Sequence, residues 1–283
     1  MAIDSDIIII GGGLNGSLMA IVAAKFGFSS IVLDSKENDT SRENPFDGRS
    51  YALALSSVRL LKNIDVFDDI RDNSQPILDI KILDGKLVQG PSQFNLHFDN
   101  NEIHDGPMGQ MVEDRFIRNA LFAKIYESNQ IDYKFASEVM EHKQEKGFIS
   151  VTLRNGNKLN TRLLVGADGK NSELARRAGV KKTGWRYNQT ALVCAIEHEI
   201  EHNGLAWQYF LPNGPLAVLP MKGKRSSVVW TEQNINAKAV NSYDKTKYTN
   251  ILEARLGNFL GKFKIIGDRH SYPLELKIAD QFV

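Results

Sequence analysis

A glycine-rich turn near the N-terminus constrains the fold of this chain more than any other feature of its sequence. The turn follows a β-branched run at residues 7–10 and opens a stretch with helical apolar spacing at residues 14–26. It matches the pattern G-x-G-x-x-G with the residues Gly11, Gly12, Gly13, Leu14, Asn15 and Gly16. A second strand at residues 31–33 ends at Asp34. Strand, turn, helix and strand in this order form a βαβ unit, which opens a doubly wound parallel sheet.

Each glycine of the pattern has a physical role in nucleotide binding. Gly11 permits the tight turn, Gly13 lets the backbone approach a diphosphate, and Gly16 lets the helix pack on the strand. The first amides of the helix, at Leu14 and Asn15, would then face the phosphates. The acid that ends the second strand lies about 20 residues further on, where a ribose-binding acid is expected. The sequence therefore predicts a dinucleotide site, and this motif alone does not separate FAD from NAD.

Beyond this unit, helical and strand patterns alternate along the chain. Helices are expected at residues 52–64, 115–127 and 247–260. Strands are expected at residues 77–98, 139–153, 163–165 and 190–230, with turns at Asn155-Gly156 and Pro212-Asn213-Gly214. The short run at 163–165 is typical of a buried strand. The alternation predicts an α/β protein, and the antiparallel stretches predict a second sheet inserted into it.

Charge, cysteine count and hydropathy exclude several classes of protein. The 35 lysines and arginines balance 34 aspartates and glutamates, so a net charge of +1 gives no reason to expect a nucleic-acid partner. Cys194 is the one cysteine, so neither a disulfide framework nor a thiolate metal site is expected, which fits a reducing compartment. Residues 7–24 are uncharged but contain the glycine turn, and acidic residues precede them instead of the basic head of a signal peptide. The sequence therefore predicts a cytoplasmic chain without a membrane span.

Residues 198–202 match the zinc-protease pattern H-E-x-x-H, but the sequence on both sides of them is typical of strands. The pattern binds zinc because one helical turn brings its two histidines onto the same face. Four residues of strand would separate His198 from His202 by about 13 Å, too far to share one zinc ion. We therefore expect no metal site in this segment.

A second glycine turn carries the first resemblance to a known family. Gly166-Ala167-Asp168-Gly169, followed by Ser172, resembles the G-A-D-G motif of the aromatic-hydroxylase class of flavoproteins. A helix start with an acidic first turn is the alternative for this motif alone. Three further segments resemble the ubiquinone-biosynthesis hydroxylases: DGRSYALALS at 47–56, GQMVED at 109–114, and YFLPNGPLAVLP at 209–220 with VWT at 229–231. The chain is thus similar, over residues 6–283, to FAD-dependent aromatic hydroxylases with the para-hydroxybenzoate hydroxylase fold.

The resemblance implies an architecture and a set of cofactor residues. An FAD-binding domain, a Rossmann-like doubly wound sheet, would span residues 1–75 and 105–182. A mostly antiparallel substrate-binding sheet would span residues 76–104 and 183–275. Besides the first glycine turn and Asp34, three polar residues would line the flavin: Arg49, Glu113 and Asp168.

The same resemblance implies an enzyme, a monooxygenase that hydroxylates the ring of a polyprenylated phenol in ubiquinone biosynthesis. FAD would be the cofactor, NAD(P)H the reductant and O2 the co-substrate. Because the cofactor carries the difficult chemistry, we expect no catalytic nucleophile on the protein and no metal. Contact with the surface of the inner membrane and association with other quinone-biosynthesis enzymes are compatible with this function. Two alternatives stay open: a hydroxylase of another aromatic substrate, and a nicotinamide-linked dehydrogenase, against which the second glycine turn argues.

The chain departs from the family pattern in two places. The family usually has an arginine three residues after the G-A-D-G serine, where this chain has Ala175 followed by Arg176. The family also continues beyond the position of Val283 into a second FAD motif. This motif begins with a Gly-Asp pair and should follow the segment Tyr272-Pro273-Leu274. Gly267-Asp268 precedes that segment, so it does not match the motif, and we expect a turn between strands there. An inactive or flavin-free fragment of such an enzyme is therefore a third alternative.

Overall fold

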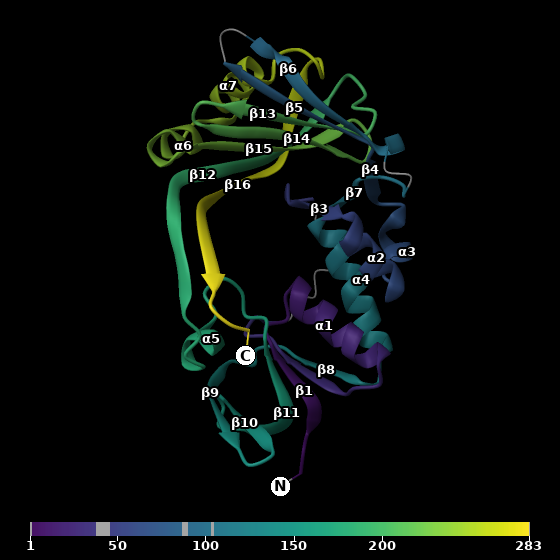
Figure 1. The fold of residues 1–283 in the computed structure, drawn as a ribbon, viewed down its shortest axis with the longest axis vertical. Coiled ribbons are helices and arrows are strands. Elements are labelled where there is room, and N and C mark those ends of the chain that lie inside the picture. Colours follow the sequence, from purple (N-terminus) through teal and green to yellow (C-terminus); the bar gives the residue numbers. More distant parts are fainter. Residues whose placement is uncertain (1, 38–45, 87–89, 103–104, 283) are drawn as a thin grey trace.

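The computed structural model describes residues 2–37, 46–86, 90–102 and 105–282, and its strands form three sheets. A six-stranded sheet lies at one end of the molecule, a seven-stranded sheet lies at the other, and a three-stranded sheet lies between them on one side (Figure 1). Two long strands, β12 (Lys182–His198) and β16 (Phe263–Ala279), run together from one end towards the other. The mixed α/β architecture with a second sheet confirms the predicted fold class.

The six-stranded sheet has the order β8-β2-β1-β11-β10-β9. Its strands are β1 (Ser5–Ile10), β2 (Ser30–Leu33), β8 (Ile131–Lys134), β9 (Val139–Glu145), β10 (Phe148–Leu153) and β11 (Lys158–Gly166). The four strands from β8 to β11 pair in parallel, and β10 and β9 extend the sheet in antiparallel pairs. Alternate residues of β1 are buried on opposite faces, since Ile9 packs with Ala20 of α1 (Leu14–Lys25) while Ile8 packs with Leu33. Burial on both faces explains the unbroken isoleucine run.

Helix α1 packs on this sheet, and α4 (Asp114–Glu127) packs on α1, with the two helices side by side (Figure 1). Ile21 of α1 and Ile117 of α4 belong to one buried cluster. The sequence predicted both helices to within one residue at each end. The burial predicted for residues 163–165 is wrong for Leu163, which is 49% exposed. Pairing on both sides of β11 satisfies its backbone, but the burial of a side chain depends on what covers that face of the sheet.

The seven-stranded sheet has the order β16-β12-β15-β14-β13-β5-β6. Besides β12 and β16, it contains β5 (Asp79–Lys86), β6 (Gly90–Asp99), which leads into a 3-10 turn at Asn100–Glu102, β13 (Leu205–Leu211), β14 (Gly214–Met221) and β15 (Arg225–Gln233). All neighbours are antiparallel except β13 and β5. Helices α6 (Asn234–Asn241) and α7 (Lys245–Leu256) contribute to the core of this sheet, in which Trp230, Tyr248 and Leu252 are fully buried.

The three-stranded sheet has the order β3-β7-β4 and corrects one predicted helix. It consists of β3 (Ser50–Ala54), β7 (Gly109–Glu113) and β4 (Ser74–Ile77), beside α2 (Leu55–Asn63) and α3 (Phe67–Arg71). The helix predicted at 52–64 is wrong at its start, because residues 52–54 pair with β7. Antiparallel pairing with β7 outweighs the helical apolar spacing there, and α2 begins only at Leu55.

The turn predicted at Gly267-Asp268 is also wrong, because both residues lie inside the continuous strand β16. The register between β12 and β16 shifts opposite this point, between Val193 and Ala195, as in a β-bulge. Gly267 has a positive φ of 66°, and Asp268 N donates to Asp47 O at 3.1 Å. The bulge therefore docks the long strand onto the loop before β3.

The predicted domain boundaries stay a prediction. In the structure, the strands of the seven-stranded sheet come from residues 79–99 and 182–279. Strand β4 crosses the proposed boundary at residue 75 and belongs to the three-stranded sheet. Of the helices within the described parts of the chain, none has both the length and the apolar character needed to cross a membrane.

Candidate functional site

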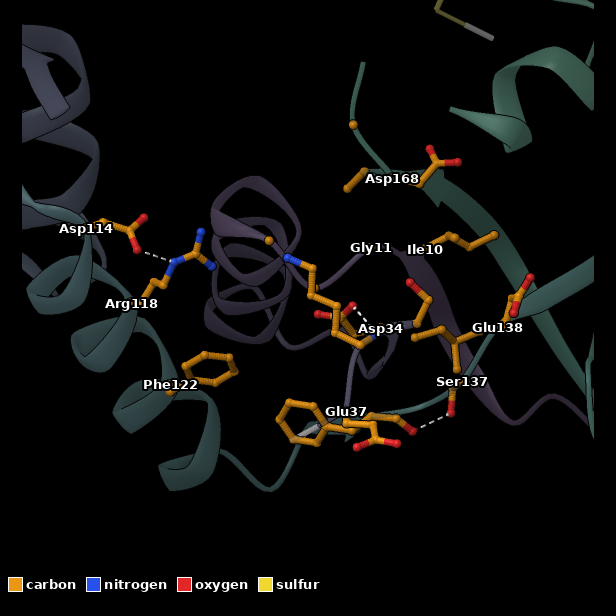
Figure 2. Close-up of a pocket in the computed structure, with 18 of the residues that line it drawn as sticks. Ile10, Gly11, Asp34, Glu37, Asp114, Arg118, Phe122, Ser137, Glu138 and Asp168 are labelled. Carbon is orange, nitrogen blue, oxygen red and sulfur yellow. Dashed lines mark hydrogen bonds and ion pairs between the residues drawn. The ribbon is translucent and has the colours of Figure 1, made fainter. Parts of the chain in front are cut away.

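A cavity of about 1550 Å3 lies where the carboxyl ends of β1, β2 and β11 face helix α4 (Figure 2). Its walls come from both glycine turns, the segment after β2, the loop before β3 and one side of α4. Ligands of doubly wound sheets bind in crevices at the carboxyl ends of the strands. The volume exceeds the roughly 300–1,000 Å3 usual for small-ligand pockets, so the cavity can admit an extended ligand.

Close packing around the first glycine turn explains two of its glycines. Gly11 has a positive φ of 100°, and a Cβ there would lie 2.4 Å from Ala167 O of the second turn. A Cβ on Gly16 would lie 1.9 Å from Gly11 O. A Cβ on Gly13, in contrast, would meet no atom within 4 Å, and Gly13 lines the cavity. The turn therefore packs tightly against the protein at Gly11 and Gly16 and is open to a ligand at Gly13.

The N-terminus of α1 supplies donors from its backbone. Gly13 is the N-cap and provides no side-chain cap, and the hydrogen bond from Ser17 N to Gly13 O, at 2.9 Å, starts the helical ladder. The amides of Leu14, Asn15 and Gly16 precede that bond, so they have no acceptor within the helix. The side chains of Leu14 and Asn15 do not belong to the described cavity lining. Their predicted contribution to cofactor binding would therefore come from the main chain.

Asp34 follows β2 and lines the cavity, and both of its carboxylate oxygens are held from the protein side. Lys36 N donates to Oδ1 at 3.0 Å, and the hydroxyl of Tyr133 lies 2.9 Å from Oδ2. Tyr133 belongs to β8, the neighbour of β2 in the sheet. Burial, followed by the charge of Asp34, raises the pKa of Tyr133, so the phenol stays protonated and can donate. Sequence reasoning missed Tyr133, because no local pattern indicates which residue of the neighbouring strand faces Asp34.

Asp168 follows β11 in the second glycine turn and lines the same cavity. Its Oδ2 accepts from Leu174 N at 3.2 Å, and Ser172 Oγ accepts from Ala175 N at 3.0 Å to cap α5 (Glu173–Arg177). The alternative role of this motif, an acid beside a helix start, is thus partly realised. However, Asp168 Oδ1 is buried without a hydrogen-bond partner. Buried carboxylate oxygens are rarely left unsatisfied, so this atom marks a position where a ligand donor would fit.

Arg49 also lines the cavity, within a cluster of charges that the sequence indicated only in part. Its guanidinium lies 2.6 Å from Asp47 and 3.4 Å from the buried carboxylate of Asp114. Asp114 also accepts from Arg118 Nε at 2.7 Å and from Tyr51 at 2.6 Å. Burial and the contact with Asp114 raise the pKa of Tyr51 to about 12.

Arg118, which the sequence analysis did not single out, projects from α4 into the cavity together with Phe122 (Figure 2). Its guanidinium is fixed by the ion pair with Asp114 and keeps further N–H groups that can donate to a ligand. Spacing on α4 could have suggested this residue, because Asp114, Arg118 and Phe122 recur at every fourth position.

Glu113 lies outside the described lining of the cavity, so its place beside the flavin stays a prediction. Its side chain is 4% exposed and forms ion pairs with Arg115 and with Arg225 of β15, each at 2.8 Å. Arg115 does line the cavity, and both arginines lie over the ring of Phe46. Glu113 therefore orients a cavity residue and connects two sheets. The sequence could not show this because Arg225 is distant along the chain.

The separation predicted for His198 and His202 is wrong, because β12 ends at His198 and the chain turns back. The two rings are buried with their centroids 5.8 Å apart. Each of the four ring nitrogens has a hydrogen-bond contact: His198 with Ile200 O and Ser226 Oγ, and His202 with Met221 O and Gly204 N. Among the described residues, no group of three or more histidine, cysteine or acidic side chains could hold a metal ion. These hydrogen bonds explain why two histidines are buried side by side here.

Comparison with known proteins agrees with this geometry. The model of a family described as "FAD binding domain" matches residues 4–278. The ubiquinone hydroxylase UbiL of Rhodospirillum rubrum is 37% identical over 279 residues, which cover 99% of this chain and 64% of that protein. The ubiquinone hydroxylase UbiM of Neisseria meningitidis is 26% identical and aligns with 100% of this chain and 61% of its own length. The chain therefore spans less than two thirds of these two relatives.

A solved structure shows the same fold. The p-nitrophenol 4-monooxygenase PnpA of Pseudomonas putida superimposes with a TM-score of 0.75 at 15% identity, covering 100% of this chain and 71% of that chain. At this identity the likeness concerns the fold alone. The family match covers both glycine turns, Asp34 and all three sheets. This chain belongs to the FAD-binding domain family.

Proposed function

We propose that this chain is the FAD-binding and substrate-binding part of a monooxygenase that hydroxylates the ring of a polyprenylated phenol in ubiquinone biosynthesis. The observation that carries the proposal is the cavity that brings the first glycine turn, Asp34 and Asp168 together. The similarity to UbiL and UbiM, both named ubiquinone hydroxylases, supports the substrate class. NAD(P)H as reductant and O2 as co-substrate complete the proposed reaction.

The residues around the cavity fit the two halves of FAD. The open side of Gly13 and the uncapped amides of α1 suit a diphosphate, which helix N-termini attract. Asp34 lies beside this turn and suits the hydroxyls of the adenosine ribose. The unpartnered buried oxygen Asp168 Oδ1 suits a hydroxyl or N–H donor of the ligand. FAD, when bound, supplies the redox chemistry that activates O2.

The protein would bind, orient and shield in this reaction and would not attack the substrate itself. We assign the diphosphate to Gly13 and the first amides of α1, in a turn that Gly11 shapes, and Arg118 lines the same cavity. Arg49, fixed by Asp47 and Asp114, would orient the ligand from the loop before β3. Glu113 would act through Arg115. The seven-stranded sheet would hold the aromatic substrate, in keeping with its resemblance to the substrate sheet of the hydroxylases.

The proposed function extends to the place where the enzyme works and to the proteins with which it associates. A polyprenylated phenol partitions into lipid, so contact with the inner membrane surface would bring the protein to its substrate. Association with other quinone-biosynthesis enzymes would also bring the protein to its substrate. Both could be measured by sedimentation with vesicles and by pull-down from cell extract.

The experiment that tests the proposed function has two readouts. Titration of this chain with FAD, followed by flavin fluorescence, should show saturable binding, whereas NAD+ should not compete at equal concentration. The protein in its full natural length, given FAD, NADPH and a polyprenylated phenol under 18O2, should form a product that contains one labelled oxygen. Absence of FAD binding, or a product without label, would refute the proposal.

A further inference from the structure

The hydroxyl of Tyr133 contacts two parts of the nucleotide site, and both are distant from Tyr133 in the sequence. It lies 2.9 Å from Gly12 O in the first glycine turn and 2.9 Å from Asp34 Oδ2 after β2. A hydroxyl has one proton, so these two acceptors share a single donor. Tyr133 thus connects the glycine turn to the acid through one atom.

The ring of Tyr133 has little freedom to move. It packs edge-on against Phe122 of α4, with centroids 5.4 Å apart, and beside Phe135, with centroids 4.5 Å apart. It also contacts the buried clusters beneath α1 and α4. Contacts from both sides therefore fix the direction in which the hydroxyl points.

The same hydroxyl explains why the second residue of the motif is glycine. A Cβ on Gly12 would lie 1.8 Å from the Tyr133 hydroxyl oxygen and 2.8 Å from Asp34 Oδ2. The general pattern leaves this position free, since it is written as x in G-x-G-x-x-G. In this chain the close approach of Tyr133 removes that freedom.

The contacts of Asp34 leave room for a ligand. An ionised carboxylate has about four acceptor positions on its two oxygens. Tyr133 occupies one on Oδ2 and Lys36 N occupies one on Oδ1. About two positions remain, enough for the two hydroxyls of a ribose. The carboxylate is held on its protein side and open on its cavity side.

We propose that Tyr133 is a positioning residue for the adenosine ribose: it fixes the Asp34 carboxylate relative to the glycine turn, so that both ribose hydroxyls can be accepted at once. The inference rests on the proposed function, because it assumes that the cavity holds the adenosine half of FAD. Tyr133 does not line the described cavity, so its effect passes through Asp34 and Gly12.

The test compares Tyr133→Phe, Asp34→Ala, the double variant and the wild type. Tyr133→Phe keeps the ring and removes only the hydroxyl, and the Kd for FAD should rise about tenfold. Asp34→Ala should raise it by about tenfold or more. In the Asp34→Ala background, Tyr133→Phe should have a much smaller effect. The matched control is Tyr248→Phe, which removes a buried hydroxyl from the core of the other sheet and should leave the Kd unchanged.

A second readout separates positioning from general damage. Calorimetry gives the Kd of each protein for ADP and for 2′,3′-dideoxy-ADP. The Kd for 2′,3′-dideoxy-ADP divided by the Kd for ADP measures selectivity for the ribose hydroxyls. The ratio should be high for the wild type, several-fold lower for Tyr133→Phe and close to one for Asp34→Ala. Because both ligands meet the same folded protein, a loss of stability alone would not change the ratio.

The outcomes distinguish the two levels of the proposal. A Tyr133→Phe protein with wild-type selectivity for ribose, alongside an Asp34→Ala protein that has lost it, would overturn the role of Tyr133 and leave the proposed function standing. A wild type that binds neither FAD nor ADP would overturn both. Loss of selectivity in Tyr133→Phe, with the control unchanged, supports the inference.

Discussion

Two acids at the edge of the cavity are held in different ways. Asp34 has a protein donor on each oxygen, from Lys36 N and from Tyr133. Asp168 has a donor on one oxygen, from Leu174 N, and its other oxygen is buried without a partner. A ligand can therefore add to the contacts of Asp34, whereas at Asp168 it would satisfy an atom that the protein leaves unsatisfied.

His198 makes the stability of the protein sensitive to mild acid. Burial lowers the pKa of His198, and the nearby His202 lowers it further, while the hydrogen bond to Ile200 O opposes this shift. Protonation is thus easier in the unfolded chain, whose imidazole has a pKa of about 6.5. The contribution of neutral His198 to stability is fully present above that value. It is lost as the pH falls through the lower pKa of the folded state.

Urea unfolding between pH 5 and pH 8 measures this prediction. The unfolding midpoint of the wild type should fall below about pH 6.5. His198→Gln keeps a side chain that can hydrogen bond and cannot take up a proton, so its midpoint should fall less over the same interval. Parallel pH profiles for the two proteins would contradict the assignment to His198.

At the level of the elements, the sequence predicted what depends on local pattern. The glycine turn, α1, α4 and the parallel strands β1 and β2 are found as expected. The start of α2 was wrong because pairing with a strand more than 50 residues away decides the conformation of residues 52–54. In the site, Gly11, Gly13, Asp34, Arg49 and Asp168 meet at one cavity. The roles of Tyr133 and Arg118 and the ion pair of Glu113 with Arg225 depend on contacts between elements, which no local pattern contains.

The bulge in β16 is a second feature that only the structure revealed, and it should be sensitive to one methyl group. A Cβ on Gly267 would lie 2.7 Å from Gly48 N, next to Arg49. Gly267→Ala would add this collision, of about 1–3 kcal/mol, to the backbone cost of about 1–2 kcal/mol for a positive φ. We expect a lower free energy of unfolding and weaker FAD binding.

Gly223→Ala is the matched control for that substitution. Gly223 also has a positive φ, of 77°, but a Cβ there would meet no atom within 4 Å. It should therefore show only the backbone cost and unchanged FAD binding. Equal losses of stability in the two variants, measured by urea unfolding, would show that the contact between the bulge and Gly48 is unimportant.

At the scale of the whole molecule, Glu113 connects parts that pack around different cores. It ends β7 in the three-stranded sheet and pairs with Arg225 of β15 in the seven-stranded sheet. Its second partner, Arg115, lines the cavity. One buried carboxylate thus couples the position of the second sheet to the wall of the nucleotide site.

Glu113→Gln tests this coupling. The substitution keeps the shape and removes the charge that two arginines share, so the free energy of unfolding should fall by about 1–3 kcal/mol. FAD affinity should fall as well, because Arg115 loses its ion pair with the charge of Glu113. Glu197→Gln removes an acid from an exposed ion pair with Lys264 and should change neither quantity. A Glu113→Gln protein as stable as this control would mean that the two sheets are held together elsewhere.

The position of β1 in the middle of its sheet has a consequence for synthesis on the ribosome. Its neighbour β11 follows far along the chain: Thr161, whose hydroxyl contacts Ser5 O, is 156 residues away. At roughly 5–20 residues per second, β1 waits about 8–30 seconds before that partner exists. During this time one edge of an isoleucine-rich strand is available to other chains. Slow elongation or crowding of ribosomes should therefore promote aggregation of nascent chains, and a chaperone that binds the first 35 or so residues should raise the yield of folded protein.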